Sequence, residues 1–471
     1  MEVNNGLTRV LLINPPIETQ MEGVIIASVC EPLGLLYIAS VLEQHGVEVE
    51  VIDGVAEGLR HEDLQCRMIE SGPDVVGIGC MMTETFSDAM ETANTAKSAV
   101  PEAKVVIGGH YASFVADKII ETFPDVDYVV VGEGEYTFFD LVRSIENKHD
   151  AGEIKGIAFR HDGKAVFTGA RKPIQNLDII PFPAKHLVAN ACYGNLSLGG
   201  SSYYISLKNF SGMITSRGCP FRCIFCSCTA FSGNTVRYRS PENVVSEIEH
   251  LVNDDGIEQI FIADDNFLMF PRRVMEICRL IKERKIDVDW LCEGRVDTAS
   301  EKMYNSMADA GCRIIFFGIE SGSQRVLDYY RKKTTVEKGE QAIAMAQRAG
   351  IDVIGSMMVG APVETEEDFQ KTLDFIDRTD MDAINMNTLK VLPGTELWRQ
   401  FEASGAIKPE DWNKYFEISN ICDAHSKEKL DEWVKIANHR FFGRPKYLVK
   451  ELWRTIKRRR DMIIPMLKNL L

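Results

Sequence analysis

The sequence predicts a two-part α/β protein: a doubly wound, Rossmann-like parallel sheet at the N-terminus, then a partial (β/α)6 barrel and a helical C-terminal region. Three observations support this prediction. Short apolar runs alternate with helical patterns over residues 8–140, a second strand-then-helix series begins near Gly212, and residues 405–471 have a mostly helical pattern. Strands that are apolar on both faces are typical of parallel sheets covered by helices on each side. A chain of 471 residues also exceeds one ordinary core, which favours several domains.

The first series supplies five predicted strands that end in small or polar residues. The strands are Arg9–Asn14, Val47–Ile52, Val75–Gly79, Val105–Gly109 and Tyr128–Gly132. Ligands of open parallel sheets bind beyond the carboxyl ends of the strands, where small residues let the backbone approach a large ligand. These ends carry Asn14-Pro15-Pro16, Asp53-Gly54, Cys80-Met81-Met82-Thr83, Gly108-Gly109-His110 and Gly132-Glu133-Gly134-Glu135. The first turn lacks a G-x-G-x-x-G fingerprint, which argues against a nicotinamide dinucleotide.

The second series predicts a barrel with its chemistry at the carboxyl rim. Its strands are expected at Gly212–Thr215, Gln259–Ala263, Asp289–Cys292, Arg313–Gly318, Asp352–Met358 and Asn385–Val391. The predicted organisation is a domain at 1–145, a connector at 146–205, the barrel at 206–404 and the helical region at 405–471. Two short strand patterns flank His161-Asp162-Gly163 inside the connector.

Composition excludes several classes of protein. The net charge is −16, which argues against a nucleic-acid-binding protein, because such proteins need a basic face. Twelve cysteines are too sparse for a disulfide scaffold, and the first residues lack an export signal, so we expect reduced thiols and a cytoplasmic location. The apolar stretch Val24–Leu42 has nearly the length of a membrane span, but Glu31 and Pro32 interrupt it, so a span is not favoured.

The sharpest motif is the CxxxCxxC run of Cys219, Cys223 and Cys226, directly after the first strand of the second series. Three thiolates this close can meet at one metal centre only if the backbone loops, which Gly218 and Pro220 favour. Zinc sites usually take four ligands in two pairs. An iron–sulfur cluster with three cysteine ligands keeps one iron free for a substrate. Cys228 could be a fourth ligand only through a strained turn.

The stretch from Gly218 to Cys226 resembles the cluster loop of the radical S-adenosylmethionine (SAM) enzymes, and the resemblance continues over residues 210–400. Later matches are Asp264-Asp265-Asn266-Phe267, Glu293-Gly294-Arg295-Val296-Asp297, Gly318-Ile319-Glu320-Ser321-Gly322-Ser323, Gly355 to Pro362 and Leu392-Pro393-Gly394-Thr395. The resemblance implies that Cys219, Cys223 and Cys226 hold a [4Fe–4S] cluster whose open iron binds SAM. It also implies a SAM site formed by Phe225, Asp264, Arg295, Glu320, Ser321 and Met358.

The N-terminal sheet resembles the cobalamin-binding domain that precedes the barrel in one branch of this family. The resemblance implies cobalamin contacts from Pro15, Cys80, Thr83, Gly108, Gly109, His110, Gly132 and Glu133. The D-x-H-x-x-G motif of methionine-synthase-type domains is missing: the loop from Pro15 to Pro32 has no histidine, and Val55 stands at the histidine position of a similar pattern after the second strand. We therefore expect that no histidine holds the lower face of the cobalt.

The resemblance implies a cobalamin-dependent methyltransferase that acts on an unactivated carbon of a small-molecule or lipid substrate, through an adenosyl radical and methylcobalamin. An external low-potential electron donor is then needed. Three alternatives stay open: an oxidative cyclase of a tetrapyrrole or lipid, a methylthiotransferase with a second cluster at Cys30, Cys66 and Cys80, and a sensor without turnover. No catalytic side chain is assigned.

The C-terminal segment 440–471 is strongly basic, with ten Lys or Arg and two Asp or Glu. Apolar residues such as Leu452, Trp453 and Ile456 interleave with Lys457-Arg458-Arg459-Arg460. A basic amphipathic helix can lie on an anionic membrane. Docking on the acidic surface of the chain itself is the alternative we favour.

Overall fold

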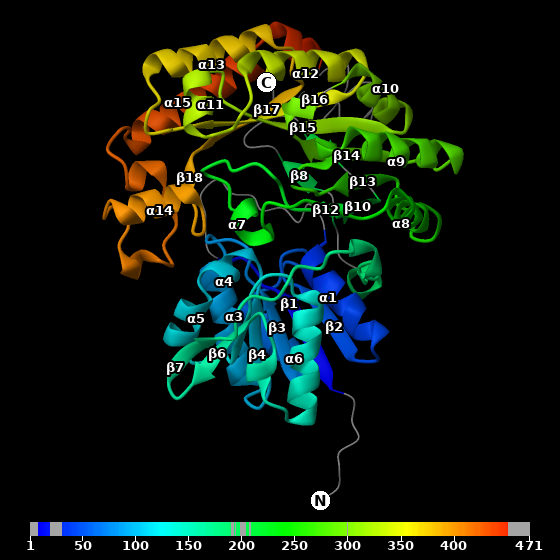
Figure 1. Ribbon diagram of the computed structural model, residues 1–471, viewed down its shortest axis with the longest axis vertical. Helices are drawn as coiled ribbons and strands as arrows, with labels where there is room; N and C mark the ends of the chain where they lie inside the picture. Colours follow the sequence, from blue (N-terminus) through cyan, green and yellow to red (C-terminus); the bar gives the residue numbers. More distant parts are fainter. Residues whose placement is uncertain are drawn as a thin grey trace, which may run out of the picture.

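Two parallel sheets form the framework of the protein, one in each half of the chain (Figure 1). The computed structural model describes residues 8–18, 31–189, 193, 195–197, 204–206, 209–298 and 300–450. The carboxyl edge of the first sheet faces the loops of the second domain, so both predicted cofactor sites lie where the two halves meet.

The first sheet has the strand order β2-β1-β3-β4-β5-β6-β7. Its parallel strands are β1 (Arg9–Asn14), β2 (Glu48–Asp53), β3 (Val75–Gly79), β4 (Lys104–Gly108) and β5 (Tyr128–Val130). The antiparallel hairpin of β6 (Ile157–His161) and β7 (Lys164–Phe167) extends it. This hairpin lies within the predicted connector 146–205, so part of that segment is continuous with the first sheet.

Helices cover both faces of the first sheet, as the doubly wound prediction requires. Leu11 and Ile13 of β1 pack with α2 (His61–Ser71), α3 (Phe86–Ala99), α4 (His110–Phe114) and α5 (Ala116–Thr122). Val10 and Leu12, which point the other way, pack with α1 (Leu33–Gln44) and α6 (Glu135–Asn147). This alternation has the period of two that a strand imposes.

The second sheet consists of six parallel strands in the order β10-β13-β14-β15-β16-β17. They are β10 (Phe210–Met213), β13 (Gln259–Ile262), β14 (Asp289–Gly294), β15 (Cys312–Glu320), β16 (Asp352–Val359) and β17 (Ala383–Thr388). The sheet is open between β10 and β17, so the predicted partial barrel is confirmed. The first and last strands begin two residues earlier than predicted; β10 ends at Met213 because Thr215 and Ser216 turn aside to bind Asp264.

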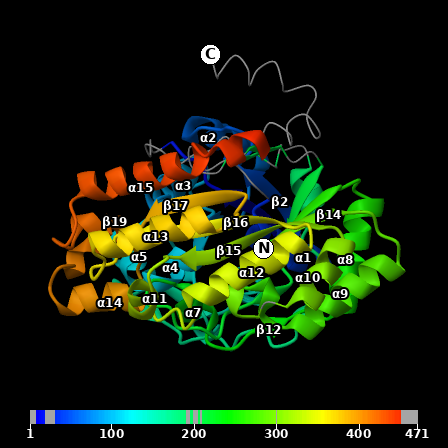
Figure 2. The same ribbon diagram turned by 90° about the horizontal axis from the view of Figure 1, so that it is seen from above.

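A layer of helices covers the outer face of the second sheet, as Figure 2 shows. These helices are α8 (Pro241–Asn253), α9 (Pro271–Glu283), α10 (Glu301–Asp309), α11 (Gln324–Tyr329), α12 (Val336–Arg348), α13 (Glu366–Arg378) and α15 (Lys427–Phe442). Local sequence fixes several starts: the Ser240 hydroxyl caps α8 before Pro241, and Thr365 and Asp368 form a capping box on α13. The inner face carries a smaller apolar cluster, with Phe210, Leu291, Ile314, Ile354 and Ala383.

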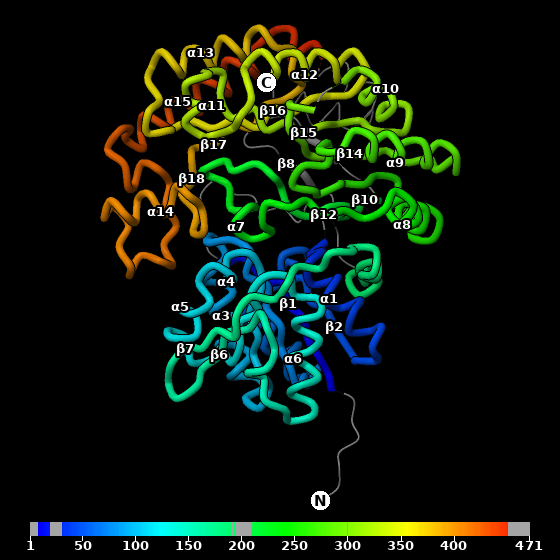
Figure 3. The backbone as a smooth tube through the Cα atoms, in the orientation of Figure 1, coloured from blue at the N-terminus to red at the C-terminus, as the bar shows by residue number. Residues whose placement is uncertain are grey.

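The C-terminal region is mostly helical and touches both domains. After α14 (Glu396–Ala403) the chain forms 3-10 turns and a two-residue strand, β19 (Phe416–Glu417), which pairs with β18 (Lys390–Val391). In Figure 3 the orange segment that follows α14 comes down beside α4. There the Tyr111 hydroxyl donates to the Trp412 carbonyl at 2.8 Å. The shorter strands are β8 (Asn195–Ser197), β9 (Tyr204–Ser206), β11 (Ser216–Arg217) and β12 (Arg237–Tyr238).

The apolar stretch Val24–Leu42 contributes the start of α1 at Leu33, and its residues 24–30 lie outside the described part of the chain. Within the described ranges, every helix is too short or too polar to cross a bilayer.

Candidate functional site

The cysteine loop connects the two strands of a short antiparallel ribbon. Strands β11 and β12 pair Arg217 with Arg237, and residues 218–236 connect them. Gly218 has a φ of 92°, and a Cβ there would lie 2.8 Å from the Thr235 carbonyl, so only glycine fits this turn. Its N–H donates to Asp265 at 2.9 Å. The loop ends in the short helix α7 (Cys228–Ser232).

The three predicted ligands lie along this loop with different exposures. Cys219 and Cys223 are half-buried, and Cys226 is exposed. A backbone turn from Cys226 N–H to the Cys223 carbonyl (3.2 Å) brings the last two together. Burial raises the pKa of the half-buried Cys219, so metal binding must displace the proton from this thiol.

The donor set fits a cluster with one open iron. Three cysteines can bind three of the four irons of a cubane cluster. Zinc, the alternative left open by the motif, usually takes four ligands in two pairs, and the CxxxCxxC run supplies three.

Arg295 adds a positive charge beside these sulfurs. Its guanidinium donates to the Cys223 sulfur at 3.6 Å and lies 3.7 Å from the centre of the Phe221 ring. Asp297 holds it at 2.7 Å, and the Lys332 carbonyl accepts a second hydrogen bond. Arg295 is buried, so its charge is little screened. This arrangement fits an anionic thiolate cluster, whose potential depends on hydrogen bonds to sulfur.

Asp264, predicted to contact SAM, is fully occupied by protein. Its two oxygens accept hydrogen bonds from the N–H and hydroxyl groups of Thr215 and Ser216, at 2.5 to 2.9 Å. Its buried carboxylate therefore shapes the turn before the cysteine loop. The next residue, Asp265, is exposed and lies close enough to act on the pKa of Cys219 and His110. Both aspartates follow β13, and no local pattern distinguishes the one that the protein occupies from the one that is exposed.

The residues predicted on β15 are held in a polar network. Glu320 is buried, has a φ of 65° and lies at a break in the register between β15 and β16. It forms an ion pair with the buried Lys332, a partner that no sequence pattern indicated. The Ser321 hydroxyl lies 3.1 Å from the Thr372 hydroxyl and accepts the Ser323 N–H.

Two more predicted residues line the same end of the barrel. Phe225 stacks edge-on against Tyr330, with ring centres 5.1 Å apart. Met358 is half-buried and pairs with Asn387 of β17.

Glu293 is a further carboxyl group on the inner side of the second sheet. It follows Leu291 by two positions on β14, so it shares the inner face of the sheet. Desolvation, and then the charges of Asp265 and Asp264, raise its pKa to about 7, although the residue is exposed to solvent.

The carboxyl edge of the first sheet brings together the residues predicted for cobalamin. Cys80 is fully buried at the end of β3, and burial raises its pKa to about 12, so its backbone rather than its thiol lies at the edge. A Cβ on Gly109 (φ 119°) would lie 2.6 Å from the Cys80 carbonyl. Met81 and Met82, next along the chain, are 50% and 41% exposed. A glycine cradle beside exposed thioethers fits a large, partly apolar ligand.

The other residues predicted for cobalamin differ in how accessible they are to a ligand. Pro15 and Thr83 are buried, whereas Gly108 and Gly132 are half-buried, and a Cβ on Gly132 would meet no atom within 4 Å. Burial lowers the pKa of His110, and its ring meets Phe231 of α7 edge-on, with centres 3.8 Å apart. The carboxylate of Glu133 is already bound by Arg217 and Arg237, so only its main chain is free to meet a corrin.

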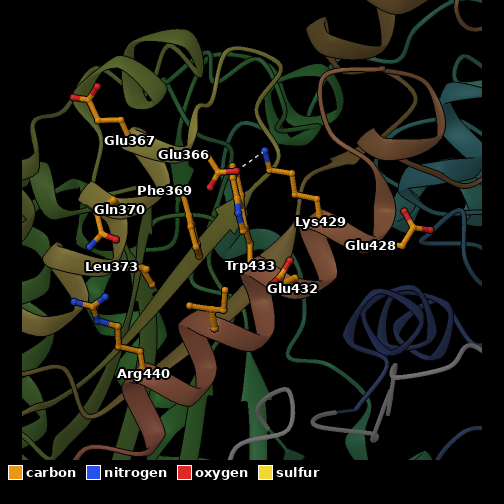
Figure 4. Close-up of a pocket in the computed structure, with 11 residues that line it drawn as sticks. Glu366, Glu367, Phe369, Gln370, Leu373, Glu428, Lys429, Glu432, Trp433 and Arg440 are labelled. Atoms are coloured by element: carbon orange, nitrogen blue, oxygen red, sulfur yellow. Dashed lines mark ion pairs between the residues drawn. The ribbon is translucent and has the colours of Figure 1, made fainter.

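A groove of about 1020 Å3 lies between α13 and α15 (Figure 4). Phe369 and Trp433 stack on its floor with ring centres 4.5 Å apart, and an ion pair joins Lys429 to Glu366 at 2.7 Å. It is formed by two helices on the outer face of the second sheet, so it does not belong to the candidate cofactor sites.

Comparison with known proteins decides the family. A model of the radical SAM superfamily matches residues 213–376, and a model of the B12 binding domain matches residues 24–142. An uncharacterized methyltransferase of Pyrococcus horikoshii is 33% identical over 448 residues, covering 94% of this chain and 95% of the relative. The chain belongs to the cobalamin-binding radical SAM family. The predicted family and its three cofactors, a [4Fe–4S] cluster, SAM and cobalamin, are confirmed.

Named relatives of this radical SAM enzyme favour methyl transfer. Cytidylyl-2-hydroxyethylphosphonate methyltransferase of Streptomyces wedmorensis is 31% identical over 81% of this chain and 79% of its own length. Anaerobic magnesium-protoporphyrin IX monomethyl ester cyclase of Rubrivivax gelatinosus is 28% identical over 98% of this chain and 82% of its own length. The prediction of an enzyme of the methyltransferase class is confirmed, with cyclases among the relatives.

Solved structures confirm the fold of the family. The tryptophan-binding methyltransferase TsrM from Kitasatospora setae, with cobalamin and a [4Fe–4S] cluster bound, has a TM-score of 0.70 at 21% identity, over 85% of this chain and 79% of that chain. OxsB, with aqua-cobalamin and SAM bound, has a TM-score of 0.72 at 20% identity, over 88% of this chain and 65% of that chain.

Proposed function

We propose that this radical SAM enzyme methylates an unactivated carbon of a small-molecule substrate held between its two domains. One observation carries the proposal: the cysteine loop lies directly on the carboxyl edge of the first sheet, with Phe231 of α7 packed on His110. The cluster with SAM would supply hydrogen abstraction, and cobalamin would supply the methyl group. Contact between the two loops supports their use on one substrate.

The chain's own residues take distinct roles in this proposal. Cys219, Cys223 and Cys226 would hold the cluster. Arg295 would hydrogen-bond to the sulfur of one ligand. The SAM site would be lined by Phe225, Glu320, Ser321 and Met358, with Asp264 holding the turn beside it. Pro15, Thr83, Gly108, Gly109, His110 and Gly132 would line the cobalamin site, together with the main chain of Cys80 and Glu133. The predicted domain boundaries belong to the same proposal.

The inner face of the second sheet supports a substrate site above an apolar floor. Phe261 and Phe316 are half-buried there, and Glu293, Ser356 and Asn385 follow toward the rim. Aromatic walls with a few polar groups are typical of small-molecule sites.

An oxidative cyclase is the second candidate, because the Rubrivivax cyclase aligns over 98% of this chain. A labelled methyl group on SAM separates the two: methyl transfer predicts label in the product, and cyclisation predicts none. A methylthiotransferase has less support: Cys80 is fully buried, Cys66 is exposed on α2 and Cys30 lies outside the described residues.

The decisive test is anaerobic reconstitution with iron, sulfide and cobalamin. We expect about four irons per chain, one corrinoid, and formation of 5′-deoxyadenosine from SAM under dithionite. Replacing Cys219, Cys223 and Cys226 together with Ala should remove the iron, whereas Cys312→Ala, at a buried thiol of the second core, should keep it. Retained iron in the triple variant would contradict the ligand assignment, and absence of SAM cleavage in the wild type would favour a sensor. Comparing metabolites of a deletion strain would identify the substrate.

We propose a cytoplasmic enzyme that receives electrons from an external low-potential donor. The described part of the basic segment, 440–450, supports docking on the chain itself: Arg440 binds Asp377, Lys446 binds Asp380 at 2.9 Å and Lys450 binds Asp382. Membrane contact and a lipid substrate would depend on residues 451–471, outside the described part. Deleting 440–471 tests them: lost liposome association with an intact cluster spectrum would support membrane contact, and unchanged association would contradict it.

A further inference from the structure

Two arginines at the base of the cysteine loop bind two glutamates at the edge of the first sheet. Arg217 and Arg237 are cross-strand neighbours in the ribbon β11–β12. Arg217 donates to Glu133 at 2.8 Å and to Glu135 at 2.5 Å, and Arg237 donates to both oxygens of Glu133 at 2.7 and 2.9 Å. Glu133 lies in the loop after β5 and Glu135 is the first residue of α6, both at the edge proposed to hold cobalamin. The four side chains together are called the clamp below.

The residues around the clamp bury it and fix the geometry of its four side chains. The four side chains are between 5% and 15% exposed. Glu133 Oε2 also accepts the Ile174 N–H at 2.7 Å, and Arg237 donates to the Ile174 carbonyl at 2.7 Å. Burial acts in the opposite direction, but the two arginines keep the pKa of Glu133 below its usual value. Charge-assisted hydrogen bonds in a poorly solvated site are strong and directional.

The same loop has a second attachment at its other end. Phe231 of α7 contacts His110, and its ring centre lies 6.5 Å from that of Phe114. The cysteine segment is thus fixed to the first sheet at two points. Its base contacts the residues that follow β5, and α7 contacts the residues that follow β4. Another interdomain carboxylate, Glu31, binds Ser211 at 2.5 Å and the Gly212 N–H at 2.8 Å. Glu31 joins the domains at β10 and does not touch the cysteine loop.

We infer that the clamp sets the separation between the cluster and the cobalamin, and so couples SAM cleavage to methyl transfer. This inference rests on the proposed function. The four side chains are positioning residues, because they act through the loops that carry the cofactor ligands. Precise placement matters here, since a displacement of about 1 Å can cost on the order of 100-fold in rate. A loosened clamp would form 5′-deoxyadenosine without a matching amount of methylated product.

The first test measures the magnetic interaction between cob(II)alamin and the reduced cluster by pulsed EPR on the reconstituted full-length enzyme. Glu133→Gln keeps the shape of the side chain but places an amide N–H₂ group against N–H donors. We expect this variant and Arg217→Met to broaden the distance distribution, whereas Glu31→Gln leaves it unchanged. An unchanged distribution in both clamp variants would overturn the inference. Equal broadening of the distance distribution in Glu31→Gln would also overturn the inference. It would show that any interdomain contact has the same effect and that the clamp has no special role.

The second test needs no cofactor and separates the inference from the proposed function. Hydrogen exchange of residues 218–236 in the unloaded protein should accelerate by about tenfold or more in Glu133→Gln, and not in Glu31→Gln. Wild-type protein that binds neither cluster nor corrinoid would defeat the proposed function and the inference together. A normally loaded wild type with identical exchange in Glu133→Gln and wild type would defeat the inference alone.

Discussion

At the scale of single residues, Arg295 lies where its charge would act on the potential of the proposed cluster. Its guanidinium lies 3.6 Å from the Cys223 sulfur, and positive charge with a hydrogen bond at sulfur stabilises the reduced, more negative cluster. We predict that Arg295→Met makes the midpoint potential more negative, as measured by an EPR-monitored redox titration. The control is Arg279→Met on the exposed face of α9. An unchanged potential in a folded, iron-loaded Arg295→Met variant would contradict this role.

Glu364 makes stability depend on pH. It is buried, one oxygen accepts the N–H groups of Gly360 and Ala361, and the other has no hydrogen-bond partner in the described structure. Burial raises its pKa to about 7. The folded state therefore keeps a proton that the unfolded chain loses near pH 4.5, so this contribution to stability falls as pH rises through 7.

We predict that Glu364→Gln is more stable than the wild type at pH 8, by up to about 3 kcal/mol, and nearly equal at pH 4.5. The measurement is denaturant unfolding at both pH values, followed by circular dichroism. A difference between variant and wild type that does not change with pH would show that folding does not raise the pKa of Glu364.

At the scale of elements, the loops after β3 and β4 are held at contact distance by one glycine. A Cβ on Gly109 would meet the Cys80 carbonyl at 2.6 Å, and its φ of 119° disfavours any side chain. Gly109→Ala should push the two loops apart and weaken cobalamin binding by about tenfold or more, a change of about 1.4 kcal/mol. Gly58→Ala is the matched control, because Gly58 also has a positive φ but open space around it. The affinities are measured by absorbance titration with hydroxocobalamin. Equal affinities of Gly109→Ala and the wild type would show that Gly109 is not part of the cobalamin site.

The sequence predicted elements better than contacts. Each of the eleven predicted parallel strands exists, because buried strands and turn residues leave a local pattern. The hairpin β6–β7 falls within the predicted connector, because nothing local tells a short strand which sheet it joins. The role of Asp264 is equally hidden from the sequence, because its hydrogen bonds come from Thr215 and Ser216, far away in the sequence. Pairings such as Glu320 with Lys332 depend on tertiary structure.

At the scale of the whole molecule, the C-terminal region docks beside β17, the last strand of the open second sheet. Lys450 pairs with Asp382, whose carboxylate is 1% exposed, whereas Lys446 and Asp380 form an exposed pair. We predict that Lys450→Met lowers the free energy of unfolding by roughly 1–3 kcal/mol, because it leaves a buried charge without its cation. Lys446→Met should change it by less than about 0.5 kcal/mol. Equal effects in thermal or denaturant unfolding would show that the docked tail is held by other contacts.

An iron–sulfur cluster with one open iron at the cysteine loop is the feature on which the proposed chemistry depends most. EPR of the anaerobically reduced protein, with and without SAM, tests this directly. A [4Fe–4S]⁺ signal that changes shape when SAM is added, and that is absent when Cys219, Cys223 and Cys226 are replaced by Ala, is the predicted result. Bound zinc, metal-free thiols, or a cluster signal that does not respond to SAM would contradict it.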